Sequence, residues 1–244
     1  MTKNKNLPRV TQPNLVTPFA CNNKTIILVI PAYNEEKTIG EVISNVKNYA
    51  DFVVVVDDGS KDRTSEIAEK EGAIVYRHCI NLGLGASLIT GFKIALKLKG
   101  DIIVTFDADG QHCPFDIEKV IAPILDEKAE VVIGTRTKKG GNMPFSRKIY
   151  NYIANILTFF LYGNWVSDSQ SGLRAFKASA LEKLILSSQR MEISSEIVGQ
   201  IKKQHLKLVE VPISAIYTSY SLSKGQNFKE GLKTAWALFL DKFL

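Results

Sequence analysis

From residue 25 onward, short runs of apolar, mostly β-branched residues alternate with longer stretches in which apolar positions recur every three or four residues. The first pattern is typical of buried strands and the second of amphipathic helices. The predicted strands are residues 25–30, 52–56, 73–76, 102–106 and 130–134, and the predicted helices are residues 35–48, 62–70, 85–98 and 114–125. Strands separated by single helices join into a parallel sheet through right-handed crossovers. The pattern predicts a single α/β domain with a Rossmann-like, mostly parallel central sheet flanked by helices.

Two segments outside this alternation have a different character. Residues 1–24 contain scattered Lys, Asn and Pro and lack the apolar core of a signal peptide, so we expect a flexible tail followed by a domain over residues 25–226. Residues 149–161 are apolar, but they are fewer than the roughly 20 residues of a membrane-spanning helix. This segment is predicted to be either a core helix or a helix lying at a membrane surface.

The C-terminal segment, residues 227–244, places its apolar residues on one stripe of a predicted amphipathic helix. The stripe consists of Phe228, Leu232, Ala235, Trp236, Phe239 and Phe243. It is expected either to dock on the core or to face a membrane surface or a small membrane-embedded partner.

Composition narrows the classes of partner and compartment. With 45% hydrophobic and 23% charged residues among 244, the chain can bury a sizeable core. The net charge of +6 suits nucleic acid, an anionic membrane face or phosphate-rich ligands, but the aromatic residues are not interleaved with Lys and Arg. We therefore expect no nucleic-acid partner. Cys21, Cys79 and Cys113 are odd in number and lack metal-type spacing, which favours a reducing, cytoplasmic setting.

Acidic residues follow three of the predicted strands at the point where each strand ends. Asp107-Ala108-Asp109 follows the fourth strand, Asp57-Asp58 follows the second, and Glu35 comes shortly after the first. Buried carboxylates are costly without a partner. At the carboxyl edge of an α/β sheet, where ligands bind, a hard cation such as Mg²⁺ or Mn²⁺ is the usual partner. The convergence of these strand ends predicts a site for a nucleotide and a divalent cation.

A glycine-containing turn at residues 81–88 has a weaker signal. It contains Gly83-x-Gly85, but Leu88 stands where a dinucleotide-binding fingerprint has Gly or Ala. The Gly-Lys-Ser/Thr of a P-loop is also missing. We interpret the segment as a flexible turn and helix N-cap near the phosphates, and not as a cofactor loop.

Together these residues resemble the family-2 glycosyltransferases of GT-A fold. The branch that they resemble is that of the dolichyl-phosphate mannosyltransferase-like enzymes, which load a sugar onto a polyprenyl phosphate. The matching stretches are residues 31–35, 57–64, 106–112, 134–136, 171–176 and 211–214. Six motifs in the same order make the likeness specific, and it extends from about residue 25 to residue 226.

The resemblance implies a role for each matching residue. Nucleotide-sugar contacts are implied for Pro31, Tyr33, Glu35, Val56, Asp58, Asp107, Ala108, Asp109, Arg136 and Lys224, the last within Tyr220-x-x-Ser223-Lys224. Among these, Pro31, Tyr33, Glu35 and Asp58 would hold the base and ribose, and Val56 would line the pocket. Asp107, Asp109 and Gln111 would bind the metal, and Arg147 and Arg174 would lie near the acceptor phosphate. Thr218 and Leu84 replace basic residues of the family, which affects the donor more than the reaction class.

The implied reaction expels a nucleoside diphosphate, whose developing charge the cation, Arg136 and Lys224 would neutralise. An anionic lipid phosphate needs no strong base to attack the sugar, whereas a sugar hydroxyl does. The candidates for a base are Asp168, counted with Asp109 and Arg136 as catalytic, and Glu196. Asp168 could equally cap a turn, and Glu196 could be a solvated helix residue.

The first hypothesis is therefore an inverting, metal-dependent transferase that uses a polyprenyl phosphate at the cytosolic membrane face. It would associate peripherally with the membrane, and an oligomer is possible. The alternatives are a family-2 transferase acting on a sugar hydroxyl and a non-catalytic nucleotide-sugar sensor. A sugar-1-phosphate nucleotidyltransferase is disfavoured because its Gly-rich N-terminal loop is absent from the sequence.

Overall fold

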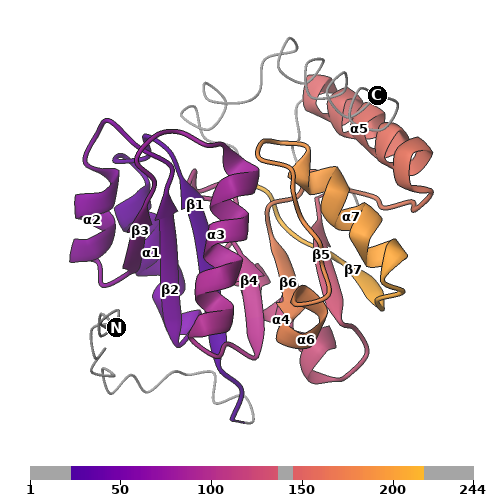
Figure 1. Cartoon of the computed structure of the whole chain (residues 1–244), viewed down its shortest axis with the longest axis horizontal. Helices are drawn as coiled ribbons and strands as arrows, with labels where there is room; N and C mark the ends of the chain where they lie inside the picture. Colours follow the sequence, from indigo (N-terminus) through magenta and orange to yellow (C-terminus); the bar gives the residue numbers. More distant parts are fainter. Residues whose placement is uncertain (1–22, 137–144, 217–244) are drawn as a thin grey trace, which may run out of the picture.

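The computed structural model describes residues 23–136 and 145–216, which form a mixed α/β domain around a central sheet (Figure 1). The strands are β1 (Ile26–Ala32), β2 (Phe52–Asp57), β3 (Ile74–Arg77), β4 (Ile102–Thr105), β5 (Val131–Thr135), β6 (Arg174–Lys177) and β7 (Leu208–Pro212). Within the described residues they form one seven-stranded sheet in the order β3-β2-β1-β4-β6-β5-β7. β6 runs antiparallel to β4 and β5, and the other paired strands are parallel. The predicted α/β class and mostly parallel sheet are confirmed.

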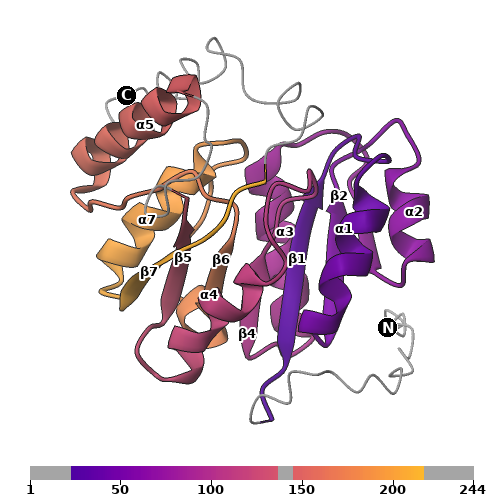
Figure 2. The same ribbon diagram turned by 180° about the vertical axis from the view of Figure 1, so that it is seen from behind.

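Helices cover both faces of the sheet, as Figures 1 and 2 show. One face carries α1 (Ile39–Val46), the 3₁₀ turn η1 (Lys47–Tyr49), α2 (Thr64–Lys70) and α4 (Asp116–Leu125). The other face carries α3 (Leu84–Lys97), α6 (Ala178–Leu181) and α7 (Ile193–Lys203). The helix α5 (Phe145–Tyr162) packs against α7 instead of against the sheet.

The central strand β1 shows why the sequence of the sheet is so apolar. Because successive side chains of a strand point to opposite faces, Leu28 and Ile30 pack beneath α1 and α4, whereas Ile27 and Val29 pack beneath α3. All of these side chains are completely buried. A parallel sheet covered on both faces requires such a continuous apolar run.

The strands and helices predicted before residue 135 are all present, with shifted ends. The first helix begins at Ile39 and not at residue 35, because the Glu35 carbonyl accepts from Thr38 N and Ile39 N in a turn that precedes α1. Two strands in the second half, β6 and β7, were not predicted. Each is only four or five residues long, and β7 ends in Pro212, so neither gives a strong periodic signal.

The apolar segment 149–161 lies within α5, and its outer side is not covered by described residues. The exposed fractions of Ile149, Tyr152, Ile153 and Phe160 are 42%, 59%, 44% and 77%. Within the described ranges, no helix combines the length and the apolar content that a membrane crossing requires. Residues 1–22 of the predicted tail (residues 1–24) and the whole predicted helix at 227–244 lie outside the described residues.

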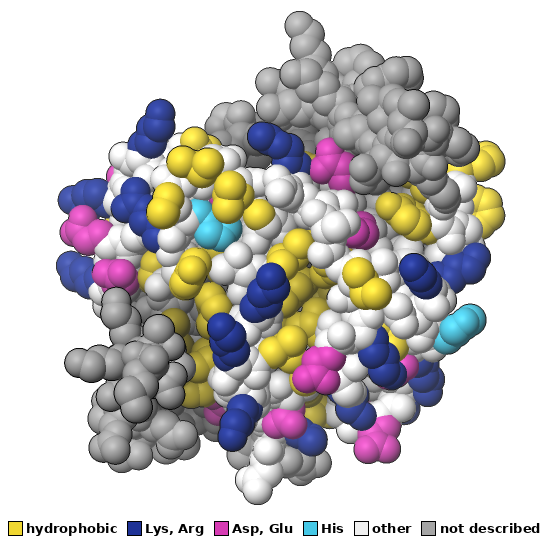
Figure 3. All heavy atoms as spheres, in the orientation of Figure 1, with side chains coloured by type: hydrophobic (Ala, Val, Ile, Leu, Met, Phe, Trp, Pro, Cys, Tyr) yellow, Lys and Arg dark blue, Asp and Glu magenta, His cyan; other side chains and the backbone are white. Residues whose placement is uncertain are grey.

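The face of the molecule seen in Figure 3 carries Lys and Arg side chains spread among acidic ones. They do not gather there into a continuous basic stripe of the kind that follows a nucleic-acid backbone.

Candidate active site

The ends of β1, β2 and β4 meet at one edge of the sheet, and the residues that follow them form the candidate site. Ala32 pairs with Asp57 in parallel register, and Asp58 N donates to Ala32 O at 2.8 Å. Phe106 N donates to Val29 O at 3.0 Å, which brings the segment starting at Asp107 to the same edge. The predicted convergence of acidic strand ends is confirmed.

The turns after β1 and β2 are fastened to each other by hydrogen bonds. Asn34 N donates to Ser60 Oγ at 2.9 Å, and Lys61 N donates to Asn34 Oδ1 at 2.8 Å. Glu35 N donates to Thr64 Oγ1 at 2.8 Å. Between these contacts the Tyr33 ring remains 42% exposed, so an aromatic surface is available beside the predicted nucleotide site.

Asp58 is only 4% exposed, and its carboxylate is occupied by protein groups. It accepts from Leu82 N at 2.9 Å and Gly83 N at 2.7 Å, and it lies 2.8 Å from His78 Nδ1. In this arrangement Asp58 holds the turn before α3. Val56, predicted to line the pocket, is completely buried in the core beneath α3, so its side chain does not line an open site.

The glycine turn before α3 is closely packed against the loop at 188–190, which corrects the expectation of a flexible turn. Ala86 N donates to Gln189 O at 3.0 Å, and a Cβ added at Gly85 would overlap Ser188 O. The partner loop is held by Glu196, which accepts from Ser188 N at 2.9 Å and also from the backbone and hydroxyl of the preceding serine. Glu196 is therefore neither solvated nor placed to act as a base.

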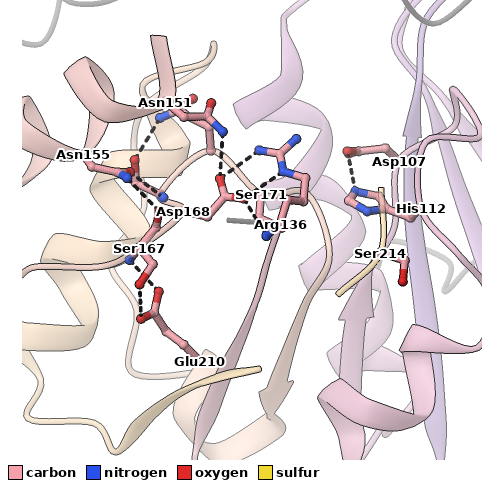
Figure 4. Close-up of polar contacts among 12 residues, drawn as sticks. Asp107, His112, Arg136, Asn151, Asn155, Ser167, Asp168, Ser171, Glu210 and Ser214 are labelled. Atoms are coloured by element: carbon pink, nitrogen blue, oxygen red, sulfur yellow. Dashed lines mark hydrogen bonds and ion pairs between the residues drawn. The ribbon is translucent and has the colours of Figure 1, made fainter. Parts of the chain in front are cut away.

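Asp107 lies in a cradle built by His112 and Gly172. His112 Nε2 is 2.9 Å from Asp107 Oδ2 (Figure 4), and the His112 ring is buried. A Cβ added at Gly172 would overlap the Asp107 carboxylate, so only glycine leaves room for it. Desolvation opposes ionisation, but the hydrogen bond and charge of His112, followed by the charges of Arg136 and Arg174, keep the pKa of Asp107 below its usual range.

Asp109 has the opposite tendency. Desolvation and the negative charge of Asp107 raise the pKa of Asp109, although it accepts from Gln111 N at 3.0 Å and from the Gln111 amide. Two carboxylates whose charges oppose each other are stabilised when a cation binds between them.

The residues at this edge fit a hard divalent cation. No cluster of three or more His, Cys, Asp or Glu side chains with metal-ligand geometry occurs in the described part of the chain. The donor set would instead be the oxygens of Asp107, Asp109 and Gln111. A set this small suits Mg²⁺ or Mn²⁺, which commonly take further ligands from substrate phosphates.

Arg136, at the end of β5, is paired with Asp168. Its Nε donates to Asp168 Oδ2 at 2.7 Å and its Nη2 donates to Asp168 Oδ1 at 2.8 Å. The Asp168 side chain has no exposed surface. Sequence reasoning named both residues as catalytic but did not predict their pairing.

Arg174 does not lie where an acceptor phosphate could reach it, which corrects the prediction. It is 3% exposed, and it donates to Ser171 O at 2.9 Å and to Ser169 O at 2.7 Å. Burial, partly countered by nearby carboxylates, lowers the pKa of Arg174 to about 10. The Arg147 side chain and Lys224, like Thr218 and Tyr220, lie outside the described residues.

Sequence reasoning missed the roles of His112 and Gly172. Both stand inside matched stretches, at 106–112 and 171–176, but a histidine or a glycine in such a stretch does not reveal its partner. His112 lies five residues from Asp107 and Gly172 lies 65 residues from it, so only the folded chain brings the three together.

Comparison with known proteins gives a consistent result. The sequence model of the family described as "Glycosyl transferase family 2" matches residues 27–185. An uncharacterized protein of Methanocaldococcus jannaschii is 51% identical over 227 residues, which cover 91% of this chain and 93% of that protein. The UDP-N-acetylglucosamine–dolichyl-phosphate N-acetylglucosaminyltransferase of Methanococcus voltae is 44% identical over 243 residues, covering 90% of this chain and 97% of that one.

Among solved structures, the chain is similar to glucosyl-3-phosphoglycerate synthase from Mycobacterium tuberculosis in complex with Mn²⁺, uridine diphosphate and phosphoglyceric acid. The TM-score is 0.71 with 21% identity, covering 90% of this chain and 78% of that chain. At this identity the likeness shows the fold, and the predicted GT-A fold is confirmed.

Proposed function

Because the chain belongs to glycosyltransferase family 2 and is a glycosyltransferase, we propose that it transfers a sugar from a nucleoside-diphosphate sugar to a dolichyl-type polyprenyl phosphate. The transfer would invert the anomeric carbon and take place at the cytosolic face of a membrane. One observation carries the proposal. Paired carboxylates, Asp107 and Asp109, and an arginine fixed at the same edge, Arg136, are the groups that a diphosphate leaving group needs.

A divalent cation held by Asp107, Asp109 and Gln111 would neutralise the charge that develops on the departing diphosphate. Arg136 would bind a phosphate oxygen, and the exposed ring of Tyr33 would stack on the base. The Mn²⁺ and uridine diphosphate in the similar solved structure support a cation in this role.

The structure favours a phosphate acceptor over a hydroxyl acceptor. The bond from the anomeric carbon to the diphosphate breaks, and a bond from that carbon to an oxygen of the lipid phosphate forms. No proton has to be removed from an anionic phosphate, whereas a hydroxyl would need a base. Asp168 and Glu196, the candidates for that base, are both buried and hydrogen-bonded to protein groups.

The donor that we propose to test first is UDP-N-acetylglucosamine, because a relative 44% identical over nearly its whole length is named for that donor and for dolichyl phosphate. Guanosine-diphosphate and uridine-diphosphate sugars of mannose and glucose complete the panel. Purified protein is incubated with each radiolabelled donor, dolichyl phosphate and Mn²⁺ or Mg²⁺, and the label in the organic phase is counted.

The expected result is transfer that disappears with EDTA and returns when Mn²⁺ or Mg²⁺ is added in excess. Asp109→Asn serves as the inactive control. Metal-dependent donor binding without any label in the organic phase would contradict the polyprenyl phosphate acceptor.

Peripheral membrane association is part of the proposal and is supported by the apolar side of α5, which no described residue covers. Ile149, Tyr152, Ile153 and Phe160 are exposed on this helix, and Lys148 beside them is also exposed. An apolar face next to a basic residue suits an anionic membrane surface. Liposome flotation should show binding that Ile153→Ser combined with Phe160→Ser weakens. Absence of binding with or without anionic lipid would contradict direct docking.

A further inference from the structure

Arg136 donates three hydrogen bonds to the carboxylate of Asp168, two from its guanidinium and one from its backbone. Besides the contacts of Nε at 2.7 Å and Nη2 at 2.8 Å, Arg136 N donates to Asp168 Oδ2 at 3.1 Å (Figure 4). Two parallel N–H···O bonds fix both the plane and the direction of a guanidinium. Asp168 is completely buried, while the Arg136 side chain is 14% exposed. One partner is therefore an internal anchor, and the other reaches the surface of the site.

The residues on both sides of Asp168 are held by two further elements. Glu210, on β7, accepts from Ser167 N at 2.6 Å and from Ser167 Oγ at 2.8 Å. Asn155, on α5, donates to Ser167 O at 2.8 Å and accepts from Ser169 N at 2.9 Å. Both neighbours of Asp168 are therefore held by hydrogen bonds, and its carboxylate contacts Arg136 at the end of β5.

A second residue of α5 contacts the carboxylate itself. Asn151 Nδ2 lies 3.4 Å from Asp168 Oδ1, a long hydrogen bond. Asn151 and Asn155 are four residues apart and so lie on the same side of the helix. The helix whose outer side is apolar and exposed is thus joined through its inner side to the ion pair.

Arg136 lies between Asp168, its anchor, and Asp107. Asp107 belongs to the proposed cation site of Asp107, Asp109 and Gln111, which we call the metal edge. Figure 4 shows Arg136 between Asp168 on one side and Asp107 on the other. Arg136 follows β5 and Asp107 follows β4 by one residue, and because β6 runs antiparallel to both strands, their carboxyl ends lie at the same edge of the sheet. A phosphate group bound near Asp107 would therefore meet a guanidinium whose direction is already set. Such preorganisation avoids the loss of side-chain freedom that accompanies binding by a mobile arginine.

We propose that Asp168 is a positioning residue that aims Arg136 at the phosphate groups of the reaction, and that α5 maintains this geometry through Asn151 and Asn155. This inference rests on the proposed function and deepens it by giving Asp168 a role other than that of a base. A base must receive a proton from substrate, but both oxygens of Asp168 already accept N–H groups of Arg136 and neither is exposed.

A double-mutant cycle separates the two roles. Asp168→Asn keeps the size of the side chain and removes its charge, and we expect kcat to fall about 10²-fold because Arg136 is no longer aimed. In an Arg136→Ala background the same change should lower kcat by less than about threefold, because its effect acts through the arginine. If Asp168→Asn and Arg136→Ala lower kcat independently, so that their effects multiply in the double variant, the proposal is overturned. Loss of the acidic limb of the pH–rate profile in Asp168→Asn, which is the signature of a base, would also overturn it.

A second variant keeps the proposal testable if Asp168→Asn does not fold. Asn155→Leu removes both hydrogen bonds to the loop without touching the ion pair, and we expect kcat to fall about tenfold and only in the presence of Arg136. Thr158→Val is the matched control. Thr158 lies on the same helix and is buried, but its hydroxyl contacts Ser195 at 2.8 Å and not the loop, so activity should be unchanged. An equal loss in both variants would overturn the role of α5.

Failure of this inference is distinguishable from failure of the proposed function. Transfer to dolichyl phosphate by the unmodified protein tests the proposed function alone. If that transfer is absent, the same cycle is measured on the affinity for UDP-N-acetylglucosamine with Mn²⁺ by calorimetry. Coupling between Asp168→Asn and Arg136→Ala would still support positioning, and additive effects would overturn it.

Discussion

The metal edge lies beside the ion pair of Arg136 with Asp168, which we call the Arg136 anchor. The carboxylates of these two regions are neutralised in different ways. At the metal edge, Asp107 and Asp109 oppose each other, and the pKa of Asp109 is raised by desolvation and by Asp107. At the anchor, one buried carboxylate meets one guanidinium at two points. In the proposed function the first region would be stabilised by a cation from solution, whereas the second carries its own cation, Arg136. Together they would provide two positive charges of different origin for phosphate oxygens.

Removing a carboxylate from the metal edge should have the largest effect on activity. We expect Asp109→Asn to lower transfer by about 10³-fold, because the cation loses a charged ligand. The free energy of unfolding should not fall, because Asp109 is a charge that its surroundings disfavour. Transfer assays and thermal unfolding measure the two quantities. Asp126→Asn, at an exposed pair with Lys128, is the control and should change neither. Retained transfer in Asp109→Asn would contradict the metal edge.

A methyl group at Gly172 should damage the same edge without removing any ligand. The added Cβ overlaps the Asp107 carboxylate, so Gly172→Ala must displace it, and transfer should fall about 10²-fold. Ser171→Ala is a matched neighbour. Its hydroxyl is buried and has no hydrogen-bond partner among the described residues, so its loss should be nearly neutral. Similar losses of transfer in both variants would show that the segment before β6, and not the cradle around Asp107, is sensitive to substitution.

Removing the contact between His112 and Asp107 should weaken metal binding more than it lowers the stability of the fold. His112→Phe keeps a ring against Phe106, where the two ring centroids are 5.5 Å apart, but removes the contact at 2.9 Å to Asp107. Residues that orient a metal ligand typically contribute 10–100-fold in affinity, so Mn²⁺ binding should weaken by about tenfold or more. Calorimetric titration with Mn²⁺ measures this. The control His205→Asn alters an exposed histidine, and unchanged affinity in His112→Phe would contradict the cradle.

Substitution of Glu196 is expected to have the smallest effect on activity. It compares a carboxylate that holds the scaffold with the carboxylates of the metal edge. Glu196→Gln should retain transfer within about threefold, because the side chain holds the loop at 187–188 and not substrate. Stability should fall by about 1–2 kcal/mol, since hydrogen bonds to a charged acceptor are weakened. Chemical denaturation measures the stability. Abolished transfer with an unchanged fold would instead favour a base and a hydroxyl acceptor.

The first half of the molecule was predictable from sequence because its information is local. Each of its strands is a continuous apolar run, each helix has its own period, and the acidic residues directly follow the strand ends. Parallel connection then brings those ends to one edge whatever the details of packing. The second half lacks this property. There β6 enters the sheet antiparallel between β4 and β5, from a segment with no strand signal.

From sequence alone, the strands and helices up to residue 135, the acidic edge and the kinds of residue around it could be predicted. What those residues contact depends on how distant parts of the chain fold together. Asp168 meets Arg136, 32 positions away, and Asp107 is cradled by Gly172. Arg174 and Glu196 were candidates for function, but their side chains make hydrogen bonds that hold turns of the backbone. The reason is physical: a residue type fixes which bonds a side chain can make, but burial and distance, set by the whole chain, decide which of them form.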